Sequence, residues 1–327
     1  MMNKADRAKL AKQTINDFIP RLLKSDARAR KGVEGSELIH YAPVKVSKRA
    51  STSARTTDDA QEGSQIGPGL AQSSLHNFFS TIPQKRKVED TQVEAEPTTQ
   101  KSNTCLDMPD STMPRIRVIK SDSFDAAAAS LKAHPKSSIA VLNMASALSP
   151  GGGVLRGALA QEEALCIRST LYPSLNPTFY RMPLLSAVYT PDVLVFRGSD
   201  LVDLRKSDWF YTGVISCAAL KGPDVEKGET GKMVYSAEKD REVMTEKIRL
   251  IFQIANNKRI KHLILGALGC GAYHNPPEEV AQIFRSVILG GRRKEGITGI
   301  EEITFAIFDE GENLRSFKKA LEDVMVD

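Results

Sequence analysis

The chain has 327 residues, an apolar share of 41% and a formal net charge of +5. The apolar share is slightly low for a wholly globular chain, so we expect one folded domain beside a polar, poorly ordered part. No apolar run reaches the roughly 20 residues that cross a bilayer, and the charged N-terminus lacks the apolar core of a secretory signal. We therefore expect a soluble intracellular protein. The mild positive charge suits an acidic partner without requiring one.

Residues 4–24 have apolar side chains at helical spacing, interrupted by Pro20, and predict a helix within an extension over residues 1–44. Residues 45–112 are dominated by polar and charged side chains, and we expect a disordered linker there. Residues 113–327 alternate apolar strands with helices, which predicts an α/β domain with a sheet covered on both faces. The expected strands are 115–119, 138–142, 193–196, 213–217, 262–265 and 303–308, and the expected helices are 123–131, 159–171, 237–255, 277–289 and 312–325.

The cysteines and histidines lack the short spacings of metal or redox sites. We therefore expect reduced thiols and neither a metal nor another cofactor.

The first segment whose residues could form a reactive site is NMASALSPGGGVLRGALAQEE, from Asn143 to Glu163. It leaves a buried strand at its carboxyl end, where open α/β sheets place their ligands, and it enters a helix whose free N–H groups suit a diphosphate. The adjacent Glu162 and Glu163 should point about 100° apart on that helix and so not face one atom. Either feature alone would also fit a glycine loop followed by acidic residues at a helix N-terminus.

A second segment, LGALGCGAYHNPP, runs from Leu265 to Pro277 between another apolar strand and another helix. Its glycines predict a second backbone cradle, and Tyr273 could stack on a sugar or a base. The glycine spacing is not that of a dinucleotide-binding fingerprint. A glycine-rich turn with Tyr273 as half-buried packing explains this segment equally well.

Together these residues resemble the poly(ADP-ribose) glycohydrolases of microbial type. The similarity rests on the triple glycine, seven residues and Gln-Glu-Glu, and extends to AVYTPDVLVFRG, VISCAA and the second glycine segment. The resemblance implies a macrodomain-like mixed sheet flanked by helices on both faces, and cleavage of ribose–ribose O-glycosidic bonds to release ADP-ribose. It implies Glu163 as catalytic acid and Glu162 as its partner on the distal ribose. The implied substrate-binding residues are Asn143, Gly151, Gly152, Gly153, Gln161, Gly269, Cys270, Gly271, Ala272, Tyr273 and Asn275.

The chemistry is coherent without the family. A carboxylic acid can protonate the leaving oxygen of a glycosidic bond and then activate water. It needs a raised pKa, which burial beside a second carboxylate would supply. The sequence offers one carboxylate pair and no metal-ligand cluster, so we predict metal-independent hydrolysis. The resemblance implies that the substrate is poly(ADP-ribose) on modified proteins, and we expect the enzyme to be a monomer. The alternatives are a module that binds ADP-ribose without cleaving it and a hydrolase of mono-ADP-ribose.

The third motif, QSSLHNFF, lies inside the polar linker. Its residues Gln72, Leu75, Phe78 and Phe79 have the spacing of a one-turn helical plug, and the pattern resembles the peptide that docks on the sliding clamp of DNA replication. The cluster Lys85, Arg86 and Lys87 follows and resembles a nuclear import signal. Both could arise by chance in a linker. We expect a nuclear protein, with the cytoplasm as a second location, that acts in replication or the DNA damage response.

Overall fold

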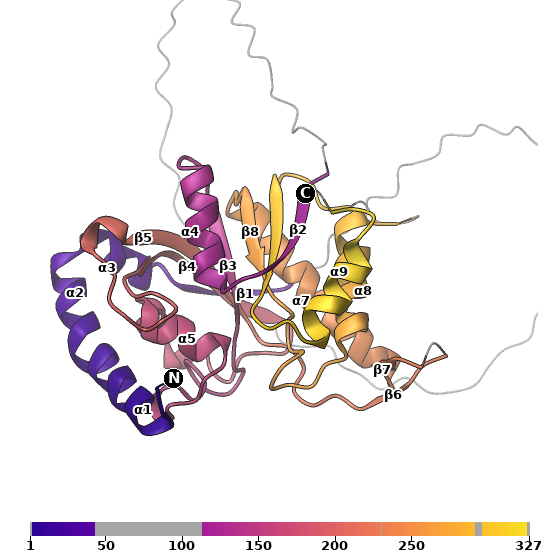
Figure 1. Ribbon diagram of the computed structural model, residues 1–327, viewed down its shortest axis with the longest axis horizontal. Coiled ribbons are helices and arrows are strands. Elements are labelled where there is room, and N and C mark those ends of the chain that lie inside the picture. Colours follow the sequence, from indigo (N-terminus) through magenta and orange to yellow (C-terminus); the bar gives the residue numbers. More distant parts are fainter. Residues whose placement is uncertain (1, 43–112, 230, 292–295, 326–327) are drawn as a thin grey trace, which may run out of the picture. The chain divides into compact units, whose positions relative to one another are not determined.

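The computed structural model describes residues 2–42, 113–229, 231–291 and 296–325 (Figure 1). The stretches before residue 43 and after residue 112 belong to one compact unit. Its centre is a seven-stranded sheet with the order β1-β4-β5-β3-β8-β9-β2. The strands of this sheet are β1 (Glu37–His40), β2 (Arg115–Lys120), β3 (Ile139–Met144), β4 (Ser186–Val195), β5 (Phe210–Cys217), β8 (His262–Leu265) and β9 (Glu302–Ile307).

Five neighbouring strands, β5, β3, β8, β9 and β2, run parallel, so their carboxyl ends meet at one edge of the sheet. Strand β4 is antiparallel to β5, and β1 is antiparallel to β4. The sheet is therefore mixed, as predicted. The carboxyl edge of the parallel strands is where loops from neighbouring strands converge.

Helices cover both faces of the sheet, which confirms the expected α/β architecture. Side chains alternate along β3: Ala140 and Leu142 join a core with α7, α8 and α9, while Ile139 and Val141 join a second core with α4, α5 and α6. Figure 1 shows α8 and α9 together at the yellow end of the chain. The helices are α4 (Ser123–Ala133), α5 (Gln161–Arg168), α6 (Leu171–Ser174), α7 (Glu238–Asn257), α8 (Pro277–Leu289) and α9 (Glu312–Leu321).

The N-terminal helix expected over residues 4–24 is present as α1 (Lys4–Gln13), a π-helical segment η1 (Thr14–Phe18) and α2 (Ile19–Ser25). Pro20 lies in the first turn of α2, directly after the π-helical segment. A proline lacks the N–H that a continuous α-helix needs, and a wider turn before it accommodates that loss.

Two elements that follow were not predicted, α3 (Ala27–Glu34) and β1. Helix α3 packs on β4 at Gly32, where a Cβ atom would lie 2.5 Å from the carbonyl oxygen of Pro191. Strand β1 extends the sheet beyond β4, with Glu37 opposite Tyr189. The N-terminal extension is therefore part of the sheet as well as a helical cover.

Other differences have local causes. Strand β4 starts earlier than expected because it continues through an irregularity between Thr190 and Val193, a stretch whose Pro191 argued against a strand. The helix expected over 159–171 ends at Arg168, because Ser169 becomes extended and bridges to Val195. The short hairpin of β6 (Val225–Lys227) and β7 (Met233–Tyr235) carried no clear signal. None of the helices described has the length and apolar character to span a membrane.

Candidate active site

The loop between β3 and α5 is anchored by Gln161, the first residue of α5. Its side-chain oxygen accepts a hydrogen bond of 2.8 Å from the N–H of Met144, and its amide nitrogen donates one of 2.7 Å to the carbonyl oxygen of Leu142. The helix is thereby attached to the carboxyl end of β3. Because both polar atoms of Gln161 are engaged by the protein, the side chain positions the site in this structure and does not offer a free group to a sugar.

Two buried carboxylates lie behind this anchor. Glu162 is 3% exposed, and its Oε2 accepts from the N–H of Ser146 at 2.7 Å. Glu163 is 7% exposed, and its Oε1 and Oε2 accept from the N–H groups of Gly153 at 2.8 Å and Ala160 at 3.1 Å. The bond from Ala160 also satisfies one of the free donors at the start of α5. Backbone N–H groups thus hold both carboxyl groups in fixed orientations.

Both carboxyl groups approach the same point in space, at Gly152. A Cβ atom on Gly152 would lie 2.7 Å from Oε1 of Glu163 and 3.0 Å from Oε2 of Glu162. The residue also has a φ of 57°, which disfavours any other amino acid. The expectation that the two glutamates could not face one atom was wrong, because their two-carbon side chains bend back toward the glycine loop from different directions on the helix.

Burial controls the charge of this pair. It raises the pKa of Glu162 to about 8, an effect opposed by the hydrogen bond from Ser146 and reinforced by the charge of Glu163. The raised pKa that the chemistry requires is therefore found at Glu162. Near neutral pH, Glu162 therefore carries a proton beside Glu163.

Two polar atoms beside the pair have no hydrogen-bond partner within the part of the chain that the structure describes. They are Oδ1 of the fully buried Asn143 and the hydroxyl of Tyr180. The Nδ2 of Asn143 donates to the hydroxyl of Ser216 at 3.0 Å and lies 3.5 Å from Glu162 Oε1. Burial and the charge of Glu162 raise the pKa of Tyr180. No motif identified Tyr180, since it lies outside both glycine segments and only the fold brings it to Glu162.

The second glycine segment divides into a structural part and an open part. Asn275 is 1% exposed, and its Nδ2 donates to the carbonyl oxygens of Leu220 and Gly269 while its Oδ1 accepts from the hydroxyl of Tyr235. Its polar atoms are therefore engaged in holding the loop. Gly269, with a φ of 75°, packs against Asn275 with no room for a side chain.

The open part of this loop is Gly271 and its neighbours. Gly271 and Ala272 are exposed, and a Cβ atom on Gly271 would meet no atom within 4 Å. Tyr273 is half-buried. Cys270 is also half-buried, and its thiol donates a hydrogen bond to the carbonyl oxygen of Leu268. This backbone is the part of the segment that a ligand can approach.

The fold brings the two segments together, because β3 and β8 are adjacent and parallel. Gly266 lies against the side chain of Met144. A cavity of about 200 Å³ opens at this edge of the sheet. Tyr273 contributes to its lining, together with residues 147–148, 182–184, 218–221 and Lys247.

Arg168, at the end of α5, has a structural place. It is 2% exposed and forms ion pairs of 2.7 Å with Asp122 and 2.9 Å with Asp125. It ties the carboxylate-bearing helix to the start of α4.

The motif at residues 72–79 that resembles a clamp-binding peptide lies outside the described residues, as does the basic cluster 85–87.

Comparisons with known proteins show what the chain is similar to. The family model of the microbial-type PARG catalytic domain, where PARG is poly(ADP-ribose) glycohydrolase, matches residues 53–198. A structure of PARG from Deinococcus radiodurans in complex with ADP-ribose is 31% identical, with a TM-score of 0.54 over 64% of this chain and 85% of that chain. PARG from Thermomonospora curvata bound to the inhibitor ADP-HPD is 29% identical, with a TM-score of 0.53 over 63% and 78% of the two chains.

A further structure of the Thermomonospora curvata enzyme aligns with nearly the whole chain and supports the fold of the described residues. It is 20% identical, with a TM-score of 0.63 over 97% of this chain and 99% of that chain. The expected macrodomain-like architecture is thus confirmed. A search of curated proteins found no match. The Deinococcus radiodurans enzyme and the family model indicate the same family, and the paired glutamates on the glycine loop fit it. The chain therefore belongs to the microbial-type poly(ADP-ribose) glycohydrolase family.

Proposed function

We propose that the protein is a poly(ADP-ribose) glycohydrolase that cleaves ribose–ribose O-glycosidic bonds and releases ADP-ribose. The observation that carries this proposal is the pair of buried carboxyl groups held against Gly152, at the sheet edge where the two glycine loops meet. Family membership supports the same activity.

The carboxyl pair has the properties that the reaction needs. Glycosidic cleavage passes through an oxocarbenium-like state while charge builds on the leaving oxygen. With its pKa at about 8, Glu162 retains a proton at neutral pH. Glu163 transfers a proton to the leaving ribose oxygen, and the resulting carboxylate then removes a proton from the water that attacks the sugar. Glu162 donates to Glu163 the proton that Glu163 passes on, and it contacts the distal ribose.

The neighbouring polar atoms fit a ribose. The free Oδ1 of Asn143 accepts from a sugar hydroxyl, and the hydroxyl of Tyr180 donates to or accepts from another. The cavity beside Tyr273 is smaller than a typical pocket for a ligand of this size, so it receives only part of an ADP-ribose unit. The exposed backbone of Gly271 provides the approach for the diphosphate.

The decisive experiment incubates purified protein with labelled poly(ADP-ribose), with and without a chelator, beside Glu163→Gln and the exposed control Glu322→Gln. We expect release of ADP-ribose by the wild type and by Glu322→Gln in both buffers, and a loss for Glu163→Gln. An intact polymer after incubation with the wild type would leave only ADP-ribose binding. Cleavage restricted to mono-ADP-ribosylated protein would indicate the mono-ADP-ribose hydrolase instead.

We also propose that residues 72–79 tether the enzyme to the replication clamp and that residues 85–87 direct it to the nucleus, where it acts in replication or DNA repair. The support is the sequence pattern: paired phenylalanines and a basic cluster in an otherwise polar segment. Phe78→Ala with Phe79→Ala should abolish a clamp pull-down, whereas Ser73→Ala with Ser74→Ala should preserve it. Unchanged binding by the phenylalanine variant would reject the tether.

The import proposal is tested separately in cells. Replacing Lys85, Arg86 and Lys87 by alanine removes the charge that an import receptor would recognise. We expect a tagged variant to redistribute to the cytoplasm, and undiminished nuclear signal would contradict the proposal.

A further inference from the structure

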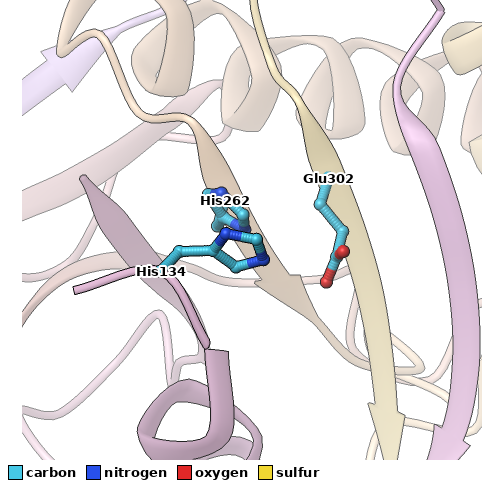
Figure 2. A group of neighbouring side chains, drawn as sticks. All are labelled: His134, His262 and Glu302. Atoms are coloured by element: carbon cyan, nitrogen blue, oxygen red, sulfur yellow. The ribbon is translucent and has the colours of Figure 1, made fainter. Parts of the chain in front are cut away.

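Two histidines and a glutamate meet at the end of the sheet opposite the paired carboxylates (Figure 2). His262 begins β8 and Glu302 begins β9, and the two residues are direct partners in the parallel register of these strands. His134 is the C-cap residue that follows α4, and α4 covers this face of the sheet. Because β8 runs parallel to β3, the cluster and the catalytic loop lie at opposite ends of the strands.

The geometry is close to that of a metal site. One ligand atom of each residue lies within 4.8 Å of the other two. The imidazole rings of His134 and His262 have centroids 4.3 Å apart and an interplanar angle of 36°. Tetrahedral zinc with bonds of about 2.0–2.1 Å separates its ligand atoms by about 3.3 Å, so closure needs side-chain shifts on the order of 1 Å.

His262 has a buried nitrogen without a protein partner. The residue is 3% exposed, and its Nδ1 lies 3.3 Å from the hydroxyl of Ser130. Its Nε2 has no hydrogen-bond partner among the described residues, and Oε2 of Glu301 is 3.8 Å away. A buried polar atom left without a partner costs free energy, whereas a neutral imidazole nitrogen is a good metal ligand.

The ligand side chains are also held from outside, as metal ligands commonly are. The contact with Ser130 orients the ring of His262, and the hydroxyl of Thr304 donates to Oε1 of Glu302 at 3.1 Å. The guanidinium of Arg117 lies 3.9 Å from the same oxygen, beyond hydrogen-bond distance. Glu302 therefore keeps lone pairs available for a cation.

We propose that His134, His262 and Glu302 bind a divalent transition-metal ion, with Zn²⁺ as the ion that best suits this ligand set. Two imidazoles and one carboxylate suit zinc, whereas Mg²⁺ and Ca²⁺ prefer oxygen ligands alone. Water or the nearby carboxylate of Glu301 completes the coordination. The ion joins α4 to β8 and β9 and stabilises the domain without taking part in the reaction at the other end of the sheet.

The test uses the full chain, stripped of metal with a chelator, dialysed and titrated with Zn²⁺ by calorimetry. We expect one equivalent to bind and the unfolding temperature to rise with Zn²⁺ concentration. His134→Ala should weaken binding at least tenfold without disturbing the core, because His134 is only half-buried. Glu302→Gln should weaken it as well, and His40→Ala, an exposed histidine on β1, should match the wild type.

Substitution with Co²⁺ identifies the ligand type. Nitrogen and oxygen ligands give visible bands without the intense near-ultraviolet absorption of a thiolate. Absence of stoichiometric Zn²⁺ binding, equal affinity in His134→Ala, or a thiolate band would overturn the proposal, the last because it would place the metal at a cysteine.

Discussion

The two ends of the parallel strands both bury ionisable side chains, but the surrounding groups differ. At the carboxyl end, backbone N–H groups of Ser146, Gly153 and Ala160 meet the oxygens of the glutamate pair. At the other end, the buried Nε2 of His262 meets no donor or acceptor among the described residues. Burial disfavours the charged form of both groups, so it raises the pKa of Glu162 and lowers the pKa of His262.

This difference teaches that burial alone does not define a site. A site is defined by the lone pairs and protons that are not engaged in hydrogen bonds within the protein. The carboxylate end keeps a proton that can be given to a leaving oxygen, and the histidine end keeps a nitrogen lone pair that can be given to a cation. The following experiments separate the two ends.

The largest effect is expected from the carboxyl pair itself. Glu163→Gln should lower kcat by about 10²–10⁴-fold, the usual contribution of general acid–base catalysis. Because both glutamates serve the same proton transfer, Glu162→Gln combined with Glu163→Gln should be no worse than the more damaging single variant. Single-turnover rates on labelled poly(ADP-ribose) measure this, and multiplicative losses would show that the two glutamates work independently.

The next effect concerns the glycine between the carboxyl groups. Gly152→Ala should displace both carboxyl groups and add backbone strain, with a cost of about 1–3 kcal/mol in the free energy of unfolding. We expect a fall in kcat that exceeds any change in KM. Gly291→Ala is the matched control, since a Cβ atom there would meet no atom within 4 Å and the residue lies outside the site. Denaturant unfolding and steady-state kinetics distinguish the two, and equal behaviour would contradict the packing described for Gly152.

The pH dependence should show the proton held by Glu162. Because the pKa of Glu162 is about 8, kcat should fall about tenfold per pH unit above pH 8, as Glu162 loses its proton. Stability follows the same sign. The contribution of protonated Glu162 is complete below its ordinary pKa of 4.5 and is lost as pH rises through about 8.

Glu162→Gln isolates the stability part of this prediction. The amide cannot ionise, so the variant should lose less stability than the wild type between pH 5 and pH 9. Thermal unfolding over this range measures the difference, and parallel curves for the two proteins would show that Glu162 does not titrate as described.

The smallest effect on activity is expected at the histidine end. His134→Ala should leave kcat within about twofold of the wild type, because His134 lies at the opposite end of the parallel strands from the carboxyl groups. Its unfolding temperature should respond to Zn²⁺ only at concentrations at least about tenfold higher than those that stabilise the wild type. A large loss of activity with unchanged stability would mean that the two ends of the sheet are coupled.

The sequence by itself determined the elements and the reactive segment. Apolar periodicity located the core strands and helices, and the order of strand, triple glycine and Gln-Glu-Glu indicated Glu162 and Glu163. These features depend on residues close together in the chain, where spacing alone controls the local backbone.

Only the tertiary structure decided which atoms are free. In the folded chain, the side chains of Gln161 and Asn275 form hydrogen bonds with backbone groups. The fold also places Tyr180 beside Glu162. It also joined His134, His262 and Glu302, which no short spacing connects. Strand register and helix packing join residues far apart in the chain, and burial then sets the pKa values, so neither property can be read from local spacing.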